Sequence, residues 1–241
     1  MTEILPGGAD DVLLICDHAS NAVPHGVDLG IDPALLDLHI AVDIGAGPLT
    51  RSLAAALDAP AILATVSRLA VEIDHEPDHI GLIPHRSDGH RIPGNERADR
   101  QDRIARFHAP YHRILRDRIR AQRPGLILSI HSFTPRLEHG GTDRPWEVGV
   151  LYNRDTRAAH PAVAYFRAQG LVTGDNEPYS GRLLNATLNR HAEGQGIPSI
   201  AIEIRNDLIR DAAGVAEWTR TLAGLTNSLR NSLARNTPLA T

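Results

Sequence analysis

The sequence predicts an α/β fold in which helices cover both faces of a mixed, mostly parallel sheet. Short apolar runs alternate with longer amphipathic segments along the 241 residues, as strands alternate with helices in such folds. Hydrophobic residues make up 42% of the chain, enough to bury a substantial core. No repeat or low-complexity linker divides the sequence. We therefore expect one domain over residues 1–241.

The expected strands are short, continuous apolar runs, as in strands that are buried on both faces: Val12–Cys16, Ala61–Val66, Leu126–Ile130, Val148–Tyr152 and Ile200–Ile204. The expected helices are longer segments with apolar residues at helical spacing: Pro48–Leu57, Ala98–Ala121, Ala158–Gln169, Ala186–Glu193 and Ala213–Ala234. A short tail, Asn236–Thr241, follows the last helix.

Three irregular stretches separate these elements: Asp74–Asn95, Glu138–Glu147 and Gly174–Arg182. The first contains three Pro, three Gly and four His without a convincing period. A long loop of this kind is usually functional or disordered. Loops that close over strand ends carry the chemistry of α/β enzymes, so we expect the site among them.

Composition excludes several classes of protein. The chain has a formal net charge of −4, and its 25 basic residues are all Arg because it contains no Lys. Schiff-base enzymes, kinases and proteins with a phosphate-binding G-x-x-x-x-G-K-[ST] loop all need a Lys and are therefore excluded. Arg is interleaved with Asp and Glu, so no basic stripe for nucleic acid emerges. Hydrolytic or metal chemistry remains.

The single cysteine, Cys16, excludes an internal disulfide. It lies in an apolar strand, where a buried inert thiol is favoured over a nucleophile. The N-terminus lacks the features of a signal peptide, and no apolar run reaches the roughly 18 residues of a membrane span. We expect a cytoplasmic protein with no membrane partner. The sequence predicts no particular oligomeric state.

Two histidines and one glutamate are placed differently from the other polar residues. His18 follows the apolar run LLIC, His131 follows LILSI, and Glu203 lies in the run IAIEIR. Imidazoles delivered from two strand ends suit a catalytic zinc, which takes three protein ligands and keeps one open position. A carboxylate beside that position can act as a general base. A lone histidine after a strand is more often structural, and the combination of all three changes that balance.

Seven segments carry a resemblance to a known family: CDHASNAVP (Cys16–Pro24), HIAVDIGAG (His39–Gly47), SRLAVEIDHEP (Ser67–Pro77), SDGHRIPGN (Ser87–Asn95), LSIHSFTPR (Leu128–Arg136), EPYSGR (Glu177–Arg182) and RHAEGQGIPSIAIEIRNDLI (Arg190–Ile209). In this order they resemble the N-formylglutamate amidohydrolase family. The resemblance implies a zinc carboxypeptidase-like, phosphorylase/hydrolase-like fold. It also implies zinc-dependent hydrolysis of a small N-acyl amino acid such as N-formylglutamate.

By that resemblance His18 and His131 bind the zinc ion and Glu203 is the base. Ser132 and Asn95 fall in matching segments and join the expected substrate-binding residues. Arg205 lies two residues after Glu203, so by the strand period we expect it to face the site and hold a substrate carboxylate. The alternative for Arg205 is an ion pair with a neighbouring Asp.

The third metal ligand departs from the pattern that the resemblance implies. A Glu is expected three residues after His18, and this chain has Asn21, whose neutral amide is a poor zinc ligand. Asp43 is our substitute. Its alternative role is the N-cap of the following helix, and the two readings are held equal. Asp17 is a weaker candidate, because adjacent strand residues face opposite ways.

A second departure concerns substrate recognition. Where the family has a D-x-N-R motif that binds a substrate carboxylate, this chain has EIDH, ending in Asp74 and His75. Either residue could instead bind metal. Other arginines could supply the missing positive charge: Arg86, Arg91, Arg97, Arg144 or Arg182. The departures leave two rival hypotheses open, a metal-binding or regulatory protein without activity and a hydrolase of a larger peptide-like amide.

Overall fold

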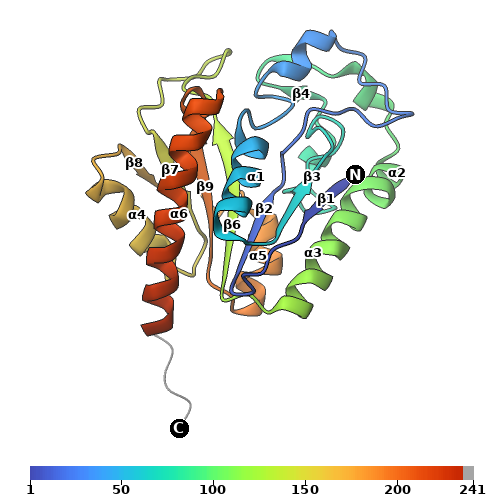
Figure 1. Ribbon diagram of the computed structural model, residues 1–241. Coiled ribbons are helices and arrows are strands. Elements are labelled where there is room, and N and C mark those ends of the chain that lie inside the picture. Colours follow the sequence, from blue (N-terminus) through green and yellow to red (C-terminus); the bar gives the residue numbers. More distant parts are fainter. Residues whose placement is uncertain (236–241) are drawn as a thin grey trace.

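Seven strands form one sheet in the order β1-β3-β2-β6-β9-β7-β8 (Figure 1). The computed structural model describes residues 1–235, so the predicted tail Asn236–Thr241 lies outside the described residues. Strands β2, β3, β6 and β9 run parallel, while β1 and β7 join the sheet antiparallel to β3 and β9. The bounds are β1 Thr2–Leu5, β2 Val12–Cys16, β3 Ala61–Ala64, β6 Leu126–Phe133, β7 Val148–Leu151, β8 Thr173–Asp175 and β9 Ser199–Arg205.

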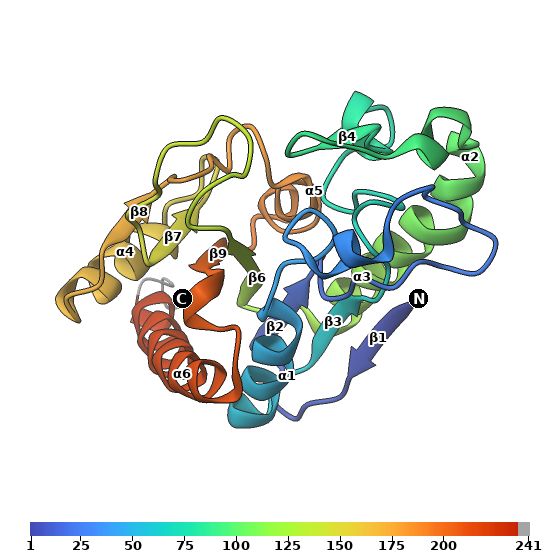
Figure 2. The same cartoon turned by 90° about the horizontal axis from the view of Figure 1, so that it is seen from above.

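Helices cover both faces of this sheet, as the view from above shows (Figure 2). One face carries α1 (Ala46–Leu57), α4 (Ala159–Ala168) and α6 (Ala212–Arg235), and the other carries α3 (Ala109–Gln122) and α5 (Ala186–His191). The predicted three-layer α/β class with a mixed, mostly parallel sheet is therefore confirmed. The remaining elements are short: α2 Arg100–Arg103, the hairpin β4 Arg86–Ser87 and β5 His90–Arg91, and single turns at Pro33–Asp37, Ile80–Leu82, Pro93–Arg97, Glu193–Gln195 and Asn206–Leu208.

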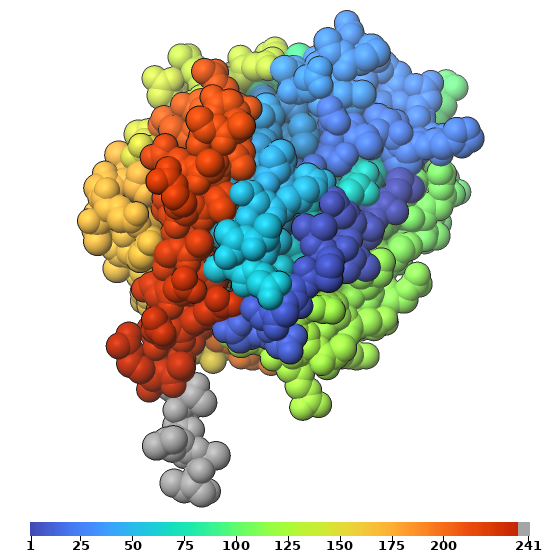
Figure 3. All heavy atoms as spheres, in the orientation of Figure 1, coloured from blue at the N-terminus to red at the C-terminus, as the bar shows by residue number. Residues whose placement is uncertain are grey.

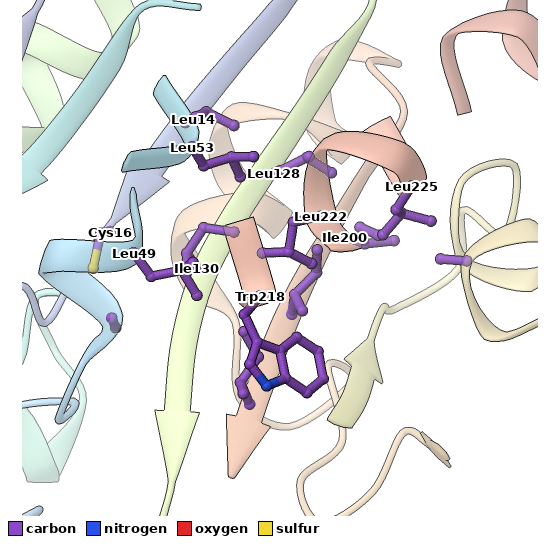
Figure 4. Close-up of a cluster of buried hydrophobic side chains, with 14 of the residues drawn as sticks. Leu14, Cys16, Leu49, Leu53, Leu128, Ile130, Ile200, Trp218, Leu222 and Leu225 are labelled. Carbon is purple, nitrogen blue, oxygen red and sulfur yellow. The ribbon is translucent and has the colours of Figure 1, made fainter. Parts of the chain in front are cut away.

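Alternate residues of the central strands pack into two separate cores. Leu14 and Leu128 face α1, α4 and α6, where Trp218 and Leu222 complete the larger cluster (Figure 4). The neighbouring strand residues face α3 and α5 on the other side. In the space-filling view α1 and α6 lie against each other over the first face (Figure 3). Cys16 is fully buried in the larger core, and this burial raises the pKa of its thiol, as expected of an inert cysteine.

Every predicted helix and strand is present, although β6 is extended and one helix is divided, and the strands β1, β4, β5 and β8 were not predicted. Strand β6 runs three residues beyond the predicted Ile130, because it pairs with β9 up to Phe133. His131 therefore lies inside a strand rather than after one. The predicted helix Ala98–Ala121 is divided into α2, a π turn at Ile104–His108, and α3. Within the described residues, every helix is too short or too polar to cross a membrane.

Candidate metal centre and active site

A pocket opens at the carboxyl ends of the parallel strands β2, β6 and β9. Its volume is about 180 Å³. His18 follows β2 by two residues, His131 lies near the end of β6, and Glu203 is the residue paired with His131 across the β6–β9 ladder. All three side chains are buried and line the pocket. Parallel pairing thus brings together residues that lie far apart in the sequence.

Asp43 lies at the centre of this group. Its Oδ2 atom is 3.2 Å from Nδ1 of His18 and 2.9 Å from Nδ1 of His131. The turn that positions it depends on Gly45, at φ 82°, where an added Cβ would meet the Ile209 carbonyl oxygen at 2.2 Å. Gly45 occupies the N-cap position of helix α1, and the Asp43 side chain bonds to His18, His131 and Arg68 rather than to a backbone N–H of the first turn of the helix. The N-cap reading of Asp43 is therefore excluded, and its carboxylate is directed into the pocket.

The other ring nitrogen of each histidine also has a partner. Nε2 of His18 hydrogen-bonds to the carboxylate of Glu72, and Nε2 of His131 lies 2.8 Å from the Ser129 hydroxyl. Such outer partners fix the orientation and the tautomer of metal-binding histidines. In both residues they leave Nδ1 as the atom directed at Asp43 Oδ2.

The contact between Nδ1 of His18 and Oδ2 of Asp43 requires a proton or a metal ion between the two atoms. Glu72 accepts hydrogen bonds only, so it takes the Nε2 hydrogen of His18. A neutral His18 would then present a lone pair at Nδ1 to the lone pairs of Asp43 Oδ2. Without a proton or a metal ion between them, the two atoms would repel. One ligand atom each of His18, Asp43 and His131 lies within 4.8 Å of the others, and two ligands of a tetrahedral zinc are about 3.4 Å apart, so the donor set fits a single zinc-type ion.

The pKa values of the two histidines agree with a cation at this position. Burial disfavours the charged form of His18, but Glu72 and Asp43 outweigh burial and raise its pKa to about 10. Burial acts in the same direction on His131, but the hydrogen bond that His131 donates to Asp43, together with the negative charge of that carboxylate, raises the pKa of His131 to about 9. The two imidazoles hold protons because carboxylates surround them. A divalent ion would replace those protons.

Arg68 balances part of the negative charge. Its Nη1 donates to Asp43 Oδ1 at 2.9 Å, and its Nη2 lies 2.7 Å from Glu72 Oε2. These pairs raise the pKa of Arg68 and lower that of Glu72 despite their burial. Arg68 is the guanidinium that lines the pocket, and both carboxylates that orient the histidines hold it in place.

Glu203 differs from the other carboxylates because its Oε2 atom is buried without a hydrogen-bond partner. Burial raises the pKa of Glu203 to about 7, although the positive charge of His131 acts to lower it. An unpaired carboxylate with a pKa near neutrality, directed into a pocket, has the properties of a general base.

The structure brings some of the other expected site residues to the pocket. Ser132 donates from Oγ to the Ile44 carbonyl and from its backbone N–H to Asp43, so it holds the Asp43 turn. Asp74 lines the pocket and accepts a hydrogen bond from the Thr187 backbone, and burial followed by the charge of Asp17 raises its pKa to about 6. His75 lines the pocket, and its ring packs at a tilt against that of His79.

Other expected residues lie elsewhere. Arg205 is bound by Asp207, with Nε 2.7 Å from Oδ1, and it lies outside the pocket lining. The expectation that it faces the pocket with Glu203 is corrected, because β9 ends at Arg205 and a turn follows. Asn95 is buried outside the pocket lining, where its amide donates to the backbone carbonyls of Leu69 and Pro84. Arg182 lines a separate surface cavity.

Two further positions resolve questions that the sequence left open. Asn21 donates to the Leu36 carbonyl at 3.0 Å and is therefore a loop-fixing residue rather than a ligand. Arg144 does not line the pocket itself, but it donates to two residues that do: the hydroxyl of Tyr179 at 2.9 Å, with the guanidinium over the tyrosine ring, and the backbone carbonyl of Thr134 at 3.3 Å.

Sequence reasoning missed several residues of the pocket: His39, Arg68, Tyr179 and the role of Glu72. For Arg68 and Glu72 a signal was available. They are charged residues four apart within the otherwise apolar run RLAVEI, where unpaired charges would be costly.

The chain is similar to known proteins in both sequence and fold. The family model of N-formylglutamate amidohydrolase matches residues 10–210. A solved gene product from Agrobacterium tumefaciens is 30% identical, with a TM-score of 0.89, over 97% of this chain and 96% of its own. An N-formylglutamate amidohydrolase from Ralstonia eutropha is 19% identical, with a TM-score of 0.68, over 98% and 99% of the two chains. A bacteriophage poly-gamma-glutamate hydrolase shares the fold at a TM-score of 0.50, with 10% identity over 96% and 89%. No curated protein matches the chain.

The fold, the pocket and these matches define the protein as an amidohydrolase of the α/β class. Within that class, the chain belongs to the N-formylglutamate amidohydrolase family.

Proposed function

We propose that this amidohydrolase depends on a divalent metal ion, most suitably zinc, and removes a small acyl group from an N-acyl amino acid. His18, Asp43 and His131 would hold the ion. The observation that carries the proposal is the meeting of two Nδ1 atoms on one oxygen of Asp43 in a buried pocket. Because Glu72 takes the Nε2 hydrogen of His18, a proton or a metal ion is needed between His18 Nδ1 and Asp43. Two imidazoles with one carboxylate form a common catalytic zinc ligand set.

A bound ion would supply Lewis-acid chemistry, polarising the substrate carbonyl and acidifying water. The chain's own residues would do the rest. Glu203 would take the proton from the attacking water and deliver it to the nitrogen of the leaving amine, and its unpartnered oxygen suits both transfers. Arg68 would stay bound to Asp43 and Glu72, which keeps both histidines in position.

The size of the pocket supports a small substrate. Ligand sites for drug-sized molecules measure about 300 to 1,000 Å³, whereas this pocket measures about 180 Å³. An N-formyl amino acid suits that space better than a peptide. N-formylglutamate is therefore our leading candidate, in agreement with the family to which the chain belongs.

In this proposal the hydroxyl of Tyr179 binds the substrate carboxylate. The Arg144 guanidinium donates to the phenol oxygen of Tyr179. The hydroxyl hydrogen is then free to be donated to a carboxylate, and burial raises the pKa of Tyr179 so that the hydrogen is retained. Ser132, Asp74 and His75 complete the wall on which the rest of the substrate would lie.

The test is hydrolysis of a substrate panel by metal-loaded and chelator-treated protein. The panel contains N-formylglutamate, N-formylglutamine, N-acetylglutamate and a formylated dipeptide. We expect N-formyl amino acids to be hydrolysed fastest, activity to disappear with the chelator, and zinc to restore it. Undiminished activity after complete metal removal would refute the metal dependence, and preference for the dipeptide would refute the substrate class.

A further inference from the structure

Outside the pocket, a second group of potential metal ligands joins two loops. His90 belongs to strand β5 of the hairpin, while Glu138 and His139 belong to the loop between β6 and β7. One ligand atom of each lies within 4.8 Å of the others. Nε2 of His90 is 2.8 Å from Oε2 of Glu138, and the rings of His90 and His139 lie 5.6 Å apart. Glu138 and His139 are exposed and His90 is partly so, which leaves the group open to ions in solution.

The backbone around these side chains holds them in place. Asp88, at the tip of the hairpin, accepts hydrogen bonds from the backbone N–H groups of Glu138 and His139, at 2.8 and 3.1 Å. Gly89 has a φ of 84°, and an added Cβ there would lie 2.3 Å from Nδ1 of His139. The His139 ring therefore packs directly on the glycine backbone. The two ligand-bearing loops are joined before any ion binds.

We propose that His90, Glu138 and His139 form a second binding site for a zinc-type ion. Two imidazoles and one carboxylate match the preferences of zinc, with water completing the coordination. Ligands of a tetrahedral zinc are about 3.4 Å apart, so the exposed side chains need to move by an ångström or so from their present separations. The site shares no residue with the pocket and does not depend on the proposed function.

The position of this site gives the ion a structural role. The loop that carries Glu138 and His139 follows Phe133 and Thr134, which line the pocket. On the hairpin side, the Asp88 carboxylate also lies 3.0 Å from Nε2 of His39, another pocket residue. An ion held between the two loops would fix one edge of the pocket.

Calorimetric titration of chelator-treated protein with zinc measures the number of sites. We expect two binding events per chain, one in the pocket and one at this group, for the wild type and for the control His25→Ala, an exposed histidine that is not part of the group. The double variant His90→Ala/His139→Ala should lose one event, and Asp43→Asn should keep the event that the double variant loses. An unchanged number of events in the double variant, or binding there only at millimolar zinc, would overturn the proposal.

Limited proteolysis gives an independent readout. Because the chain contains no Lys, trypsin cuts only after Arg, and the side chain of Arg136 in this loop is 68% exposed. Zinc should slow cleavage after Arg136 several-fold in the wild type and in Asp43→Asn, and leave the double variant unchanged. Equal slowing in the double variant would contradict a zinc site at His90, Glu138 and His139.

Discussion

Two groups of buried histidines flank this sheet, and their surroundings give them different charges. In the pocket, carboxylates raise the pKa of His18 to about 10 and of His131 to about 9. Beside helices α3 and α5, burial and neighbouring histidines lower the pKa of His112 to about 2. Burial and nearby arginines lower that of His191 to about 4. The same side chain is a cation in one place and neutral in the other.

Hydrogen bonding explains how each group is satisfied. Nε2 of His112 donates to the Ile73 carbonyl, so its Nδ1 is a lone pair, and it accepts the Nε2 hydrogen of His191 at 2.9 Å. This chain of neutral rings is complete without any ion. The pocket histidines instead direct Nδ1 at a carboxylate oxygen. Burial alone therefore does not identify a metal site, whereas the partner of each ring nitrogen does.

The largest effect is expected in the pocket, where carboxylates surround the histidines. Glu203→Gln keeps the shape of the side chain but cannot accept a proton, so kcat should fall by on the order of 10² to 10⁴, the usual contribution of a positioned base. Metal content should stay at the wild-type level. The exposed Glu217→Gln is the matched control. If metal is lost together with activity, Glu203 is a ligand and the assigned roles are wrong.

Removing the Glu72 carboxylate, which accepts the hydrogen bond from Nε2 of His18, should weaken metal binding without removing a ligand. Glu72→Gln loses the carboxylate that orients His18, and changes of this kind cost about 10- to 100-fold in metal affinity. His112→Asn, in the neutral group, should leave the affinity unchanged. Competition with a zinc-binding dye measures both. Equal affinities for Glu72→Gln and wild type would remove the distinction between the two groups.

The neutral histidines His112 and His191 should lower the free energy of unfolding at acid pH. A histidine whose folded pKa lies below 6.5 binds its proton only after unfolding, so the free energy of unfolding falls as pH drops from about 6.5 toward 4. Each such histidine contributes about 1.4 kcal/mol per pH unit in that range. In metal-free protein His18 and His131 have raised pKa values, so their contribution is present below pH 6.5 and is lost as pH rises toward about 9.

Urea unfolding of chelator-treated protein between pH 4.5 and 9 tests both slopes. His112→Asn should reduce the acid slope and leave the alkaline slope unchanged. An acid slope that this variant leaves intact would show that other groups control acid stability.

The smallest effect is expected at Arg205. Its ion pair with Asp207 is partly exposed, with 21% and 39% of the two side chains accessible. Such pairs contribute about 0 to 1 kcal/mol. Arg205→Ala should therefore change KM by less than a few-fold, while Tyr179→Phe should raise it more. A large rise in KM for Arg205→Ala would restore this residue to the substrate site.

The sequence predicted the elements that follow from hydrophobic pattern and missed those that depend on tertiary pairing. Strand β2 was placed correctly from the run VLLIC. The edge strands β1 and β8 were missed, because each is only three or four residues long and half-exposed, so it carries no apolar run.

Within the candidate site, strand ends predicted that His18 and His131 would lie near Glu203. The turn at Asp43 left two roles open, and only the geometry of helix α1 excluded the cap. The inward direction of Arg68 and the outward direction of Arg205 could not be read from the strand period. The first residue lies in a loop, and the second is the last of its strand.

Long-range ¹H–¹⁵N NMR spectra of the histidine rings test the central claim most directly, since they report the proton on each ring nitrogen before and after zinc is added. In chelator-treated protein near pH 7.5, His18 and His131 should carry protons on both nitrogens, and His112 and His191 should be neutral. Two equivalents of zinc, enough for both proposed sites, should remove the Nδ1 proton of His18 and of His131 and leave His112 and His191 unchanged. Unaltered Nδ1 protons on His18 and His131 in the zinc-loaded protein would contradict the account.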